Sequence, residues 1–192
     1  MTDTADTVKH AAGGVAARAR QTRSRARRAA VSQERAYAGG DDRPLRAYLA
    51  LLAVYGITSA GLGGLLLRNR RRLPRAFDPG DLALLAVASF KLSRILSRDS
   101  VTSPLRAPFT RYRGSADGPA EVQEDVRGRG ARKAIGELLT CPFCLGQWTA
   151  TAFMAGHLIA PRVTRVAAGT LTVAAGADAL QLAHAAATKG SE

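Results

Sequence analysis

Residues 48–67, YLALLAVYGITSAGLGGLLL, form the longest stretch of the first half of the chain without a charged side chain. At about 1.5 Å per residue, a helix of this length spans the roughly 30 Å hydrocarbon core of a bilayer. We therefore expect a first transmembrane helix here. Gly56, Ala60 and Gly64 recur every four residues, so they form a small-residue stripe along which another helix could pack closely.

Three further apolar segments follow, at residues 81–96, 138–160 and 166–187. The second of them carries no formal charge, whereas Lys91 and Arg94 interrupt the first and Asp178 lies in the third. The low aromatic content of 5% also suits helices that pack in lipid through small residues. We predict an all-α membrane protein with about four transmembrane helices, the last three forming a core over residues 80–187.

Two polar regions flank these helices. Residues 1–47 form a basic tail with six arginines and no acid between Arg18 and Arg28, which we interpret as a solvated, partly helical segment ending at Gly39 and Gly40. Such a tail is attracted to anionic lipid head groups by about 1 kcal/mol per basic residue near the surface. Nucleic acid is a less favoured partner, because no aromatic side chain is interleaved to stack on bases.

The second polar region is the loop at residues 98–137. Pro119 is followed by Glu121, Glu124 and Asp125, an arrangement that favours a short amphipathic helix with acids in its first turns.

The basic residues predict the orientation in the membrane. Under the four-helix topology, 19 Lys and Arg residues lie on the side of the tail and the 98–137 loop, and 7 lie on the other side. The positive-inside rule then places both termini in the cytoplasm of a multi-pass protein in the cell membrane. The arginine-rich loop at residues 68–75 is a local exception to the rule, so its side is left open.

The charged residues within the predicted helices indicate an intramembrane pair. Lys91 and Asp178 lie at about the same depth in two parallel helices, roughly 17–18 Å from the start of each. We expect Asp178 to pair with Lys91 or with Arg94, which is one turn further along the same face. The alternative is that the two cations reach the inner interface from the end of their helix.

A dithiol motif, Cys141-Pro142-Phe143-Cys144, stands at the predicted cytoplasmic start of the third helix. The amides of a helix N-terminus favour a thiolate on Cys141, as in dithiol redox sites. A zinc site needs four ligands. His184 is the one histidine expected at the level of the cysteines, so a complete site would require two copies of the chain. Simple packing of two small, polarizable side chains is the third interpretation.

The chain also resembles a known family of small bacterial membrane proteins, the domain-of-unknown-function family 1360, which includes a Bacillus sporulation membrane protein. The resemblance covers roughly residues 80–185. It is carried by three strings and two single residues: Lys91-Leu92-Ser93-Arg94, Asp99, Thr102-Ser103-Pro104-Leu105-Arg106-Ala107-Pro108-Phe109, Gly136-Glu137-Leu138-Leu139-Thr140-Cys141-Pro142-Phe143-Cys144, and Trp148. The Ala- and Arg-rich composition looks actinobacterial. The resemblance implies membrane residence but no reaction, and its recurring residues include Asp99, Arg106, Glu137 and Trp148. Under the predicted topology these four residues form a cluster at the inner membrane face.

These observations favour a non-enzymatic membrane component of the envelope or of spore development, which acts through interactions at the inner membrane face. The expected partners are the lipid bilayer with its anionic head groups and a second copy or another membrane protein. No cofactor is expected. The alternatives are a membrane thiol oxidoreductase and a dimeric zinc-binding protein, both using Cys141 and Cys144.

Overall fold

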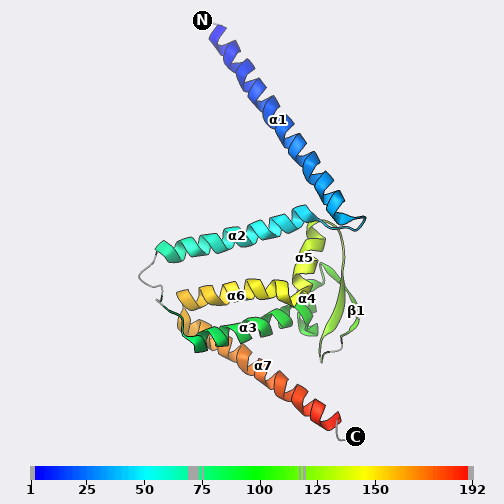
Figure 1. The fold of residues 1–192 in the computed structure, drawn as a ribbon, viewed down its shortest axis with the longest axis vertical. Coiled ribbons are helices and arrows are strands. Elements are labelled where there is room, and N and C mark those ends of the chain that lie inside the picture. Colours follow the sequence, from blue (N-terminus) through cyan, green and yellow to red (C-terminus); the bar gives the residue numbers. More distant parts are fainter. Residues whose placement is uncertain (1–2, 69–73, 75, 117, 119, 190–192) are drawn as a thin grey trace.

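The computed structural model describes residues 3–68, 74, 76–116, 118 and 120–189 of the chain (Figure 1). The elements in chain order are α1 (Asp3–Ala38), α2 (Leu45–Arg68), α3 (Pro79–Arg98), the 3₁₀ helix η2 (Ser100–Thr102), α4 (Ser103–Arg106), β1 (Thr110–Ser115), β2 (Val122–Val126), α5 (Ala131–Thr140), α6 (Pro142–Ile159) and α7 (Pro161–Lys189). The prediction of a mostly helical chain is confirmed.

Four helices, α2, α3, α6 and α7, make up what we call the bundle. Helix α3 packs against both α6 and α7, while α2 lies along the α6 side (Figure 1). Helix α3 begins two residues before its predicted segment: Pro79 occupies the first turn, and the Asp78 side chain accepts a hydrogen bond of 3.0 Å from the backbone N–H of Asp81.

The interior of the bundle is small and partly polar. Its buried apolar residues are Leu85, Ala88, Leu145, Ala155 and Ala168, and Leu84, Phe153 and Leu171 pack around the cluster formed by Leu85, Ala88 and Ala168. The other buried positions of α3, α6 and α7 are hydroxyl-bearing side chains: Ser89, Ser93, Ser97, Thr149 and Thr164. Large apolar side chains instead lie on the outside, and none of the α2 residues is buried. The bundle therefore buries mostly small and hydroxyl-bearing side chains and leaves many of its large apolar side chains exposed.

Two helices among the described residues, α2 and α7, are long and apolar enough to cross a membrane, rather than the predicted four. Asp81, Lys91 and Arg94 lower the hydropathy of α3, and Gln147 and His157 lower that of the 18-residue α6. The predicted span at residues 138–160 is also not one helix. Its first residues belong to α5, which ends at Thr140, and α6 begins at Pro142 after one extended residue.

The predicted all-α fold is wrong for the region between α3 and α6. We call η2, α4, β1, β2 and α5 the lobe, and it lies at one end of the bundle (Figure 1). Strands β1 and β2 pair antiparallel with a bulge between Tyr112 and Gly114. The short helix expected after residue 119 is not formed, because Glu124 and Asp125 belong to β2 and the backbone of Glu121 bridges to that of Asp99.

The basic tail is a continuous helix over residues 3–38 and stands apart from the bundle (Figure 1). It ends as predicted at Gly39 and Gly40, whose φ angles of 56° and 105° are ones that side chains with a Cβ rarely adopt. The stripe on α2 meets no other helix, since a Cβ added at Gly56 or Gly64 would have nothing within 4 Å. Most of the arginine-rich loop at 68–75 lies outside the described residues.

Candidate functional site

The guanidinium group of Arg106 is the centre of the lobe. Its side chain is 1% exposed and that of its partner Glu124 is 6% exposed. Its nitrogens donate to both oxygens of this carboxylate and to four other oxygens: Glu124 Oε1 (3.1 Å) and Oε2 (2.8 Å), Leu96 O (2.8 Å), Asp99 O (2.9 Å), Thr102 Oγ1 (2.7 Å) and Ser103 Oγ (3.2 Å). Two of these acceptors are backbone carbonyls at the C-terminal end of α3, which have no partner within the helix.

Both carboxylate oxygens of Glu124 also accept several hydrogen bonds. Its carboxylate also accepts hydrogen bonds from the hydroxyls of Ser103 (2.8 Å) and Thr110 (2.9 Å). Burial alone would raise the pKa of Glu124, but the hydrogen bonds from Arg106, Ser103 and Thr110, with the charge of Arg106, outweigh it and hold the pKa below its ordinary value. Because every donor of Arg106 has an acceptor, this network fixes the hairpin to α3 and leaves no free group for a ligand.

Arg94 and Asp99 belong to the same junction between α3 and the lobe. Arg94 forms an ion pair with Glu121, the residue whose backbone bridges to Asp99. Asp99 ends α3 in an extended conformation and gives its backbone carbonyl to Arg106. Of the four residues expected to cluster at the inner face, Asp99 and Arg106 are therefore brought together.

Two ion pairs connect α3 to α7. Lys91 donates to the carboxylate of Asp178, so of the two predicted partners of Asp178 the structure brings Lys91 to it. Near the other end, Arg165 donates to both oxygens of Asp81, at 2.7 Å from Nε to Oδ1, and Nε2 of His157 lies 3.5 Å from Asp81. The pairs occur in the same order along both helices, so α3 and α7 run parallel.

Glu137 and Trp148, the other two members of the expected inner-face cluster, instead contact α2. The Tyr48 hydroxyl donates to Glu137, and Arg43 lies 3.8 Å from the same carboxylate. About two turns further along α2, Tyr55 packs edge-on against Trp148, with 5.0 Å between the ring centroids. Helix α2 is thus positioned by two tyrosines.

The Tyr55 hydroxyl adds two polar contacts to that ring contact. It accepts a hydrogen bond of 2.7 Å from Gln147 Nε2 and lies 2.8 Å from the Thr151 hydroxyl. Both partners are on α6, so the Tyr55 hydroxyl fixes the position of α2 along the axis of α6.

The dithiol motif lies at the start of α6. Cys141 precedes the helix and its sulfur accepts a hydrogen bond from the backbone N–H of Cys144 at 3.2 Å. Both cysteines are free, and Cys144 is exposed. Within the described residues no three His, Cys, Asp or Glu side chains gather as metal ligands, so His184 does not join the two cysteines in a single chain. The two-copy zinc site remains a prediction.

Glu124, Ser103 and Thr110 were not recognised from the sequence as partners of Arg106. The acids after residue 119 fitted a helical first turn equally well. A signal for the strand was present in Val122 and Val126, which flank polar residues at the period expected of a half-exposed strand. The Asp81, His157 and Arg165 contacts and the two tyrosines of α2 were also missed.

Comparison with known proteins gives the following matches. A family model described as "Protein of unknown function (DUF1360)" matches residues 84–184. The chain is 35% identical over 86 residues to "Sporulation protein YjcA" of Bacillus subtilis (strain 168), covering 44% of this chain and 73% of that protein. It is 29% identical over 80 residues to "UPF0713 protein YngL" of the same organism, covering 42% of this chain and 59% of that protein. No solved structure matches.

Proposed function

Since the chain belongs to the DUF1360 family through residues 84–184, we propose that it is a non-enzymatic integral membrane protein whose lobe acts as an interaction module at the inner membrane face. Helices α2, α3, α6 and α7 cross the bilayer, and both termini and the lobe lie on the cytoplasmic side. The similarity to a protein named as a sporulation protein supports a role in spore or envelope development.

The main support for the proposal is that the bundle exposes many large apolar side chains and buries mostly small and hydroxyl-bearing ones. On α2 alone the exposed residues include Leu49, Leu52, Val54, Ile57, Leu65 and Leu67. Each such side chain favours an apolar environment over water by about 1.5–3 kcal/mol. Helices in lipid, by contrast, associate through small residues and Ser or Thr hydrogen bonds, such as that from Thr149 to the Ser89 carbonyl.

The arrangement of charges supports four crossings although two helices, α3 and α6, are less apolar. Lys91 is paired with Asp178, and Asp81 is paired with Arg165. Ionisable groups at membrane depth are tolerated when they face other helices and find partners. The lobe joins α3 to α6 at the end of the bundle where α2 begins (Figure 1), which is the side with more Lys and Arg under the four-crossing topology.

Membrane insertion is tested by expressing the full chain and extracting the membrane fraction with alkaline carbonate, then with detergent. We expect the protein to stay with the lipid in carbonate and to require detergent for release. A monodisperse full-length protein purified without detergent would contradict the proposal.

Sidedness is a second readout on the same sample. A membrane-impermeant maleimide added to inverted vesicles should label the exposed Cys144, whereas the same reagent added to right-side-out vesicles should not. Labelling from the outside would place the lobe on the wrong face.

A second candidate function, thiol–disulfide exchange, is favoured by the hydrogen bond from the Cys144 amide to the Cys141 sulfur. In this reaction the Cys141 thiolate attacks a partner disulfide and forms a mixed disulfide with release of one partner thiol. The Cys144 thiolate then displaces the second thiol, so that the pair is oxidised by two electrons and the partner is reduced.

The two functions make opposite predictions for the cysteines. An interaction module should complement a deletion strain equally well with Cys141→Ser and Cys144→Ser. An oxidoreductase should lose complementation with either variant, and its Cys141 should alkylate quickly near neutral pH. If the cysteines instead form a dimeric metal site, the purified protein should contain about half an equivalent of zinc per chain.

A further inference from the structure

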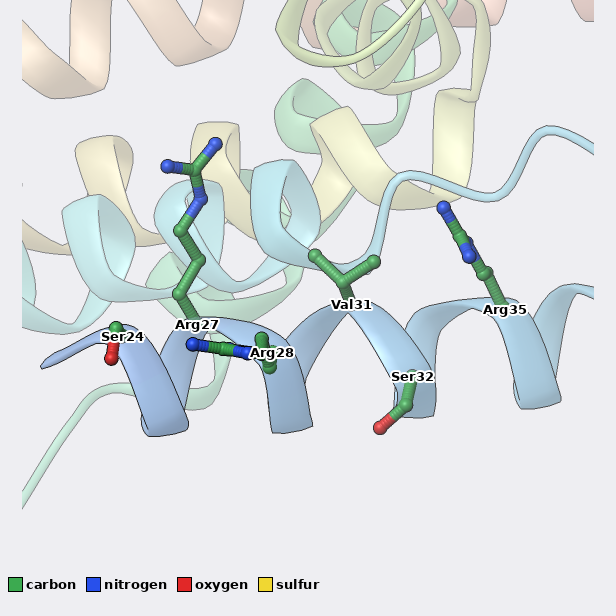
Figure 2. Close-up of a pocket in the computed structure, with 6 residues that line it drawn as sticks. All are labelled: Ser24, Arg27, Arg28, Val31, Ser32 and Arg35. Carbon is green, nitrogen blue, oxygen red and sulfur yellow. The ribbon is translucent and has the colours of Figure 1, made fainter. Parts of the chain in front are cut away.

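The basic helix α1 carries a strongly charged surface. Among the described residues, no side chain of the bundle or the lobe forms an ion pair with it. Six of its residues line one hollow, in which Arg27, Val31 and Arg35 project from the same side of the helix and Arg28 lies alongside it (Figure 2). Ser24 and Ser32 complete the lining. We call Arg27, Arg28, Val31 and Arg35 the basic face.

The positive charge of this face is not neutralised within the chain. In the described residues none of its three guanidinium groups forms an ion pair. The one acid between Arg18 and Ala38 is Glu34, against seven arginines in the same range. A row of unpaired guanidinium groups around one valine suits an anionic surface with an apolar layer beneath it, because arginine stems cover apolar groups while their heads contact anions.

The connection to α2 places α1 at the level where such a surface would lie. Helix α1 does not continue the direction of α2 but makes a steep angle with it, and the C-terminal end of α1 lies at the end of the bundle that carries the lobe (Figure 1). The turn between the two helices is tied to the lobe, because Lys133 donates to the backbone carbonyl of Asp42. In the orientation of the proposed function, on which this step rests, α1 therefore leaves the bundle at the inner membrane surface.

We propose that α1 lies on the inner leaflet and that its basic face binds the phosphate groups of anionic phospholipids. Val31 contacts the apolar boundary between the arginines, as in helices that lie in the membrane interface. Nucleic acid fits the face less well, because the nearest aromatic residue on α1, Tyr37, is not interleaved with these arginines.

The test measures hydrogen–deuterium exchange of the full chain in nanodiscs of phosphatidylcholine and in nanodiscs of phosphatidylcholine with phosphatidylglycerol. An undocked, water-exposed helix exchanges its amides quickly, and docking slows them. We expect the amides of residues 24–35 to be protected in the anionic nanodiscs alone. Salt at 1 M should remove the protection, because the Debye length falls to about 3 Å. Inorganic phosphate added to the neutral nanodiscs should not reproduce it.

Matched variants test whether the basic face, rather than net charge, is responsible. Replacing Arg27 and Arg35 by Gln should reduce the protection on the order of 30-fold, while the same loss of charge through Arg18→Gln and Arg25→Gln should reduce it less than about tenfold. Arg18 and Arg25 are exposed and lie on the opposite side of the helix from Val31, by the period of 3.6 residues per turn.

Three outcomes would overturn the inference: equal protection in both lipids, equal effects of the two variant pairs, or protection by a single-stranded RNA but not by anionic lipid. In each of them the protein would still be inserted in the nanodisc. A failure of the proposed function is distinguishable, because the chain would then not enter nanodiscs at all.

Discussion

The lobe and the bundle both bury polar groups, but they do so in opposite ways. In the lobe, the ion pair between Arg106 and Glu124 is almost fully enclosed, and every donor of the Arg106 guanidinium has an acceptor. In the bundle, Lys91 is 15% exposed and its partner Asp178 is 52% exposed. The buried residues there are mainly hydroxyl-bearing and small, and they bond to the backbone of their own or a neighbouring helix.

The difference arises because different interactions stabilise the two regions. The lobe has few buried apolar residues, so its short elements depend on one saturated charge network that joins α3, α4 and the hairpin. The bundle depends on close approach of helix backbones, which small residues permit. A substitution that removes a charge should therefore destabilise the lobe more than the bundle, and the closely packed hairpin and α5 should tolerate less added volume than the bundle does at Gly146.

The largest effect is expected from Arg106→Met, which leaves the Glu124 carboxylate buried without its cation. Removing one partner of a buried pair costs about 3–5 kcal/mol. We expect this loss in the free energy of unfolding of the detergent-solubilised protein, measured by denaturant titration. The same change at Arg113 is the control, since its pair with Asp125 is 67% and 62% exposed and should contribute less than about 1 kcal/mol. Equal effects at the two positions would contradict the role of the network.

Gly136→Ala should be next, with a cost of about 1–3 kcal/mol. A Cβ at Gly136 would lie 2.7 Å from Val126 Cγ1 and 3.1 Å from the backbone carbonyl of Phe109, so the hairpin would have to move away from α5. At Gly146, in the bundle, the nearest atom would be 4.0 Å away, and Gly146→Ala should be neutral or stabilising. Thermal unfolding of both variants in one detergent compares the lobe with the bundle directly.

A smaller effect is expected for the pair of Lys91 and Asp178. Interhelical polar contacts in membrane proteins contribute about 0.6 kcal/mol on average, so we expect a coupling energy of this size. The measurement is a double-mutant cycle with Lys91→Met, Asp178→Leu and the combination. Each single variant leaves one charge unpaired, so the double variant should be more stable than their sum implies. Strict additivity would show that the contact contributes nothing.

The smallest effect is expected from the pH dependence that Glu124 alone contributes. The pKa of Glu124 is lower in the folded lobe than its ordinary value, as the hydrogen bonds from Arg106, Ser103 and Thr110 outweigh burial. The folded state therefore gains stability from this carboxylate above the ordinary carboxyl pKa, and this stability is lost as pH falls through the depressed folded value. Unfolding curves between pH 7 and pH 3 should show the decline, and Glu124→Gln should make it shallower. An unchanged pH profile in that variant would contradict the assignment.

Sequence reasoning succeeded where one element determines the outcome. The end of α1 at Gly39 and the pairing of Lys91 with Asp178 both follow from spacing and backbone preference. It failed in the lobe, because the conformation of residues 120–126 is decided by contacts with Arg106 and β1 that are distant in sequence. The isolated propensity of Glu124 and Asp125 for a helical first turn was overridden by those contacts.

The two tyrosines that position α2 have a consequence for how such a chain can grow. Helix α2 lies outside residues 84–184, the part shared with the family, yet Tyr48 and Tyr55 fix it by hydrogen bonds to Glu137, Gln147 and Thr151. Phenol groups specify register without a complementary apolar groove. In this chain an additional helix is thus attached in front of the family region by two aromatic hydroxyls, whose partners are polar side chains that this region supplies.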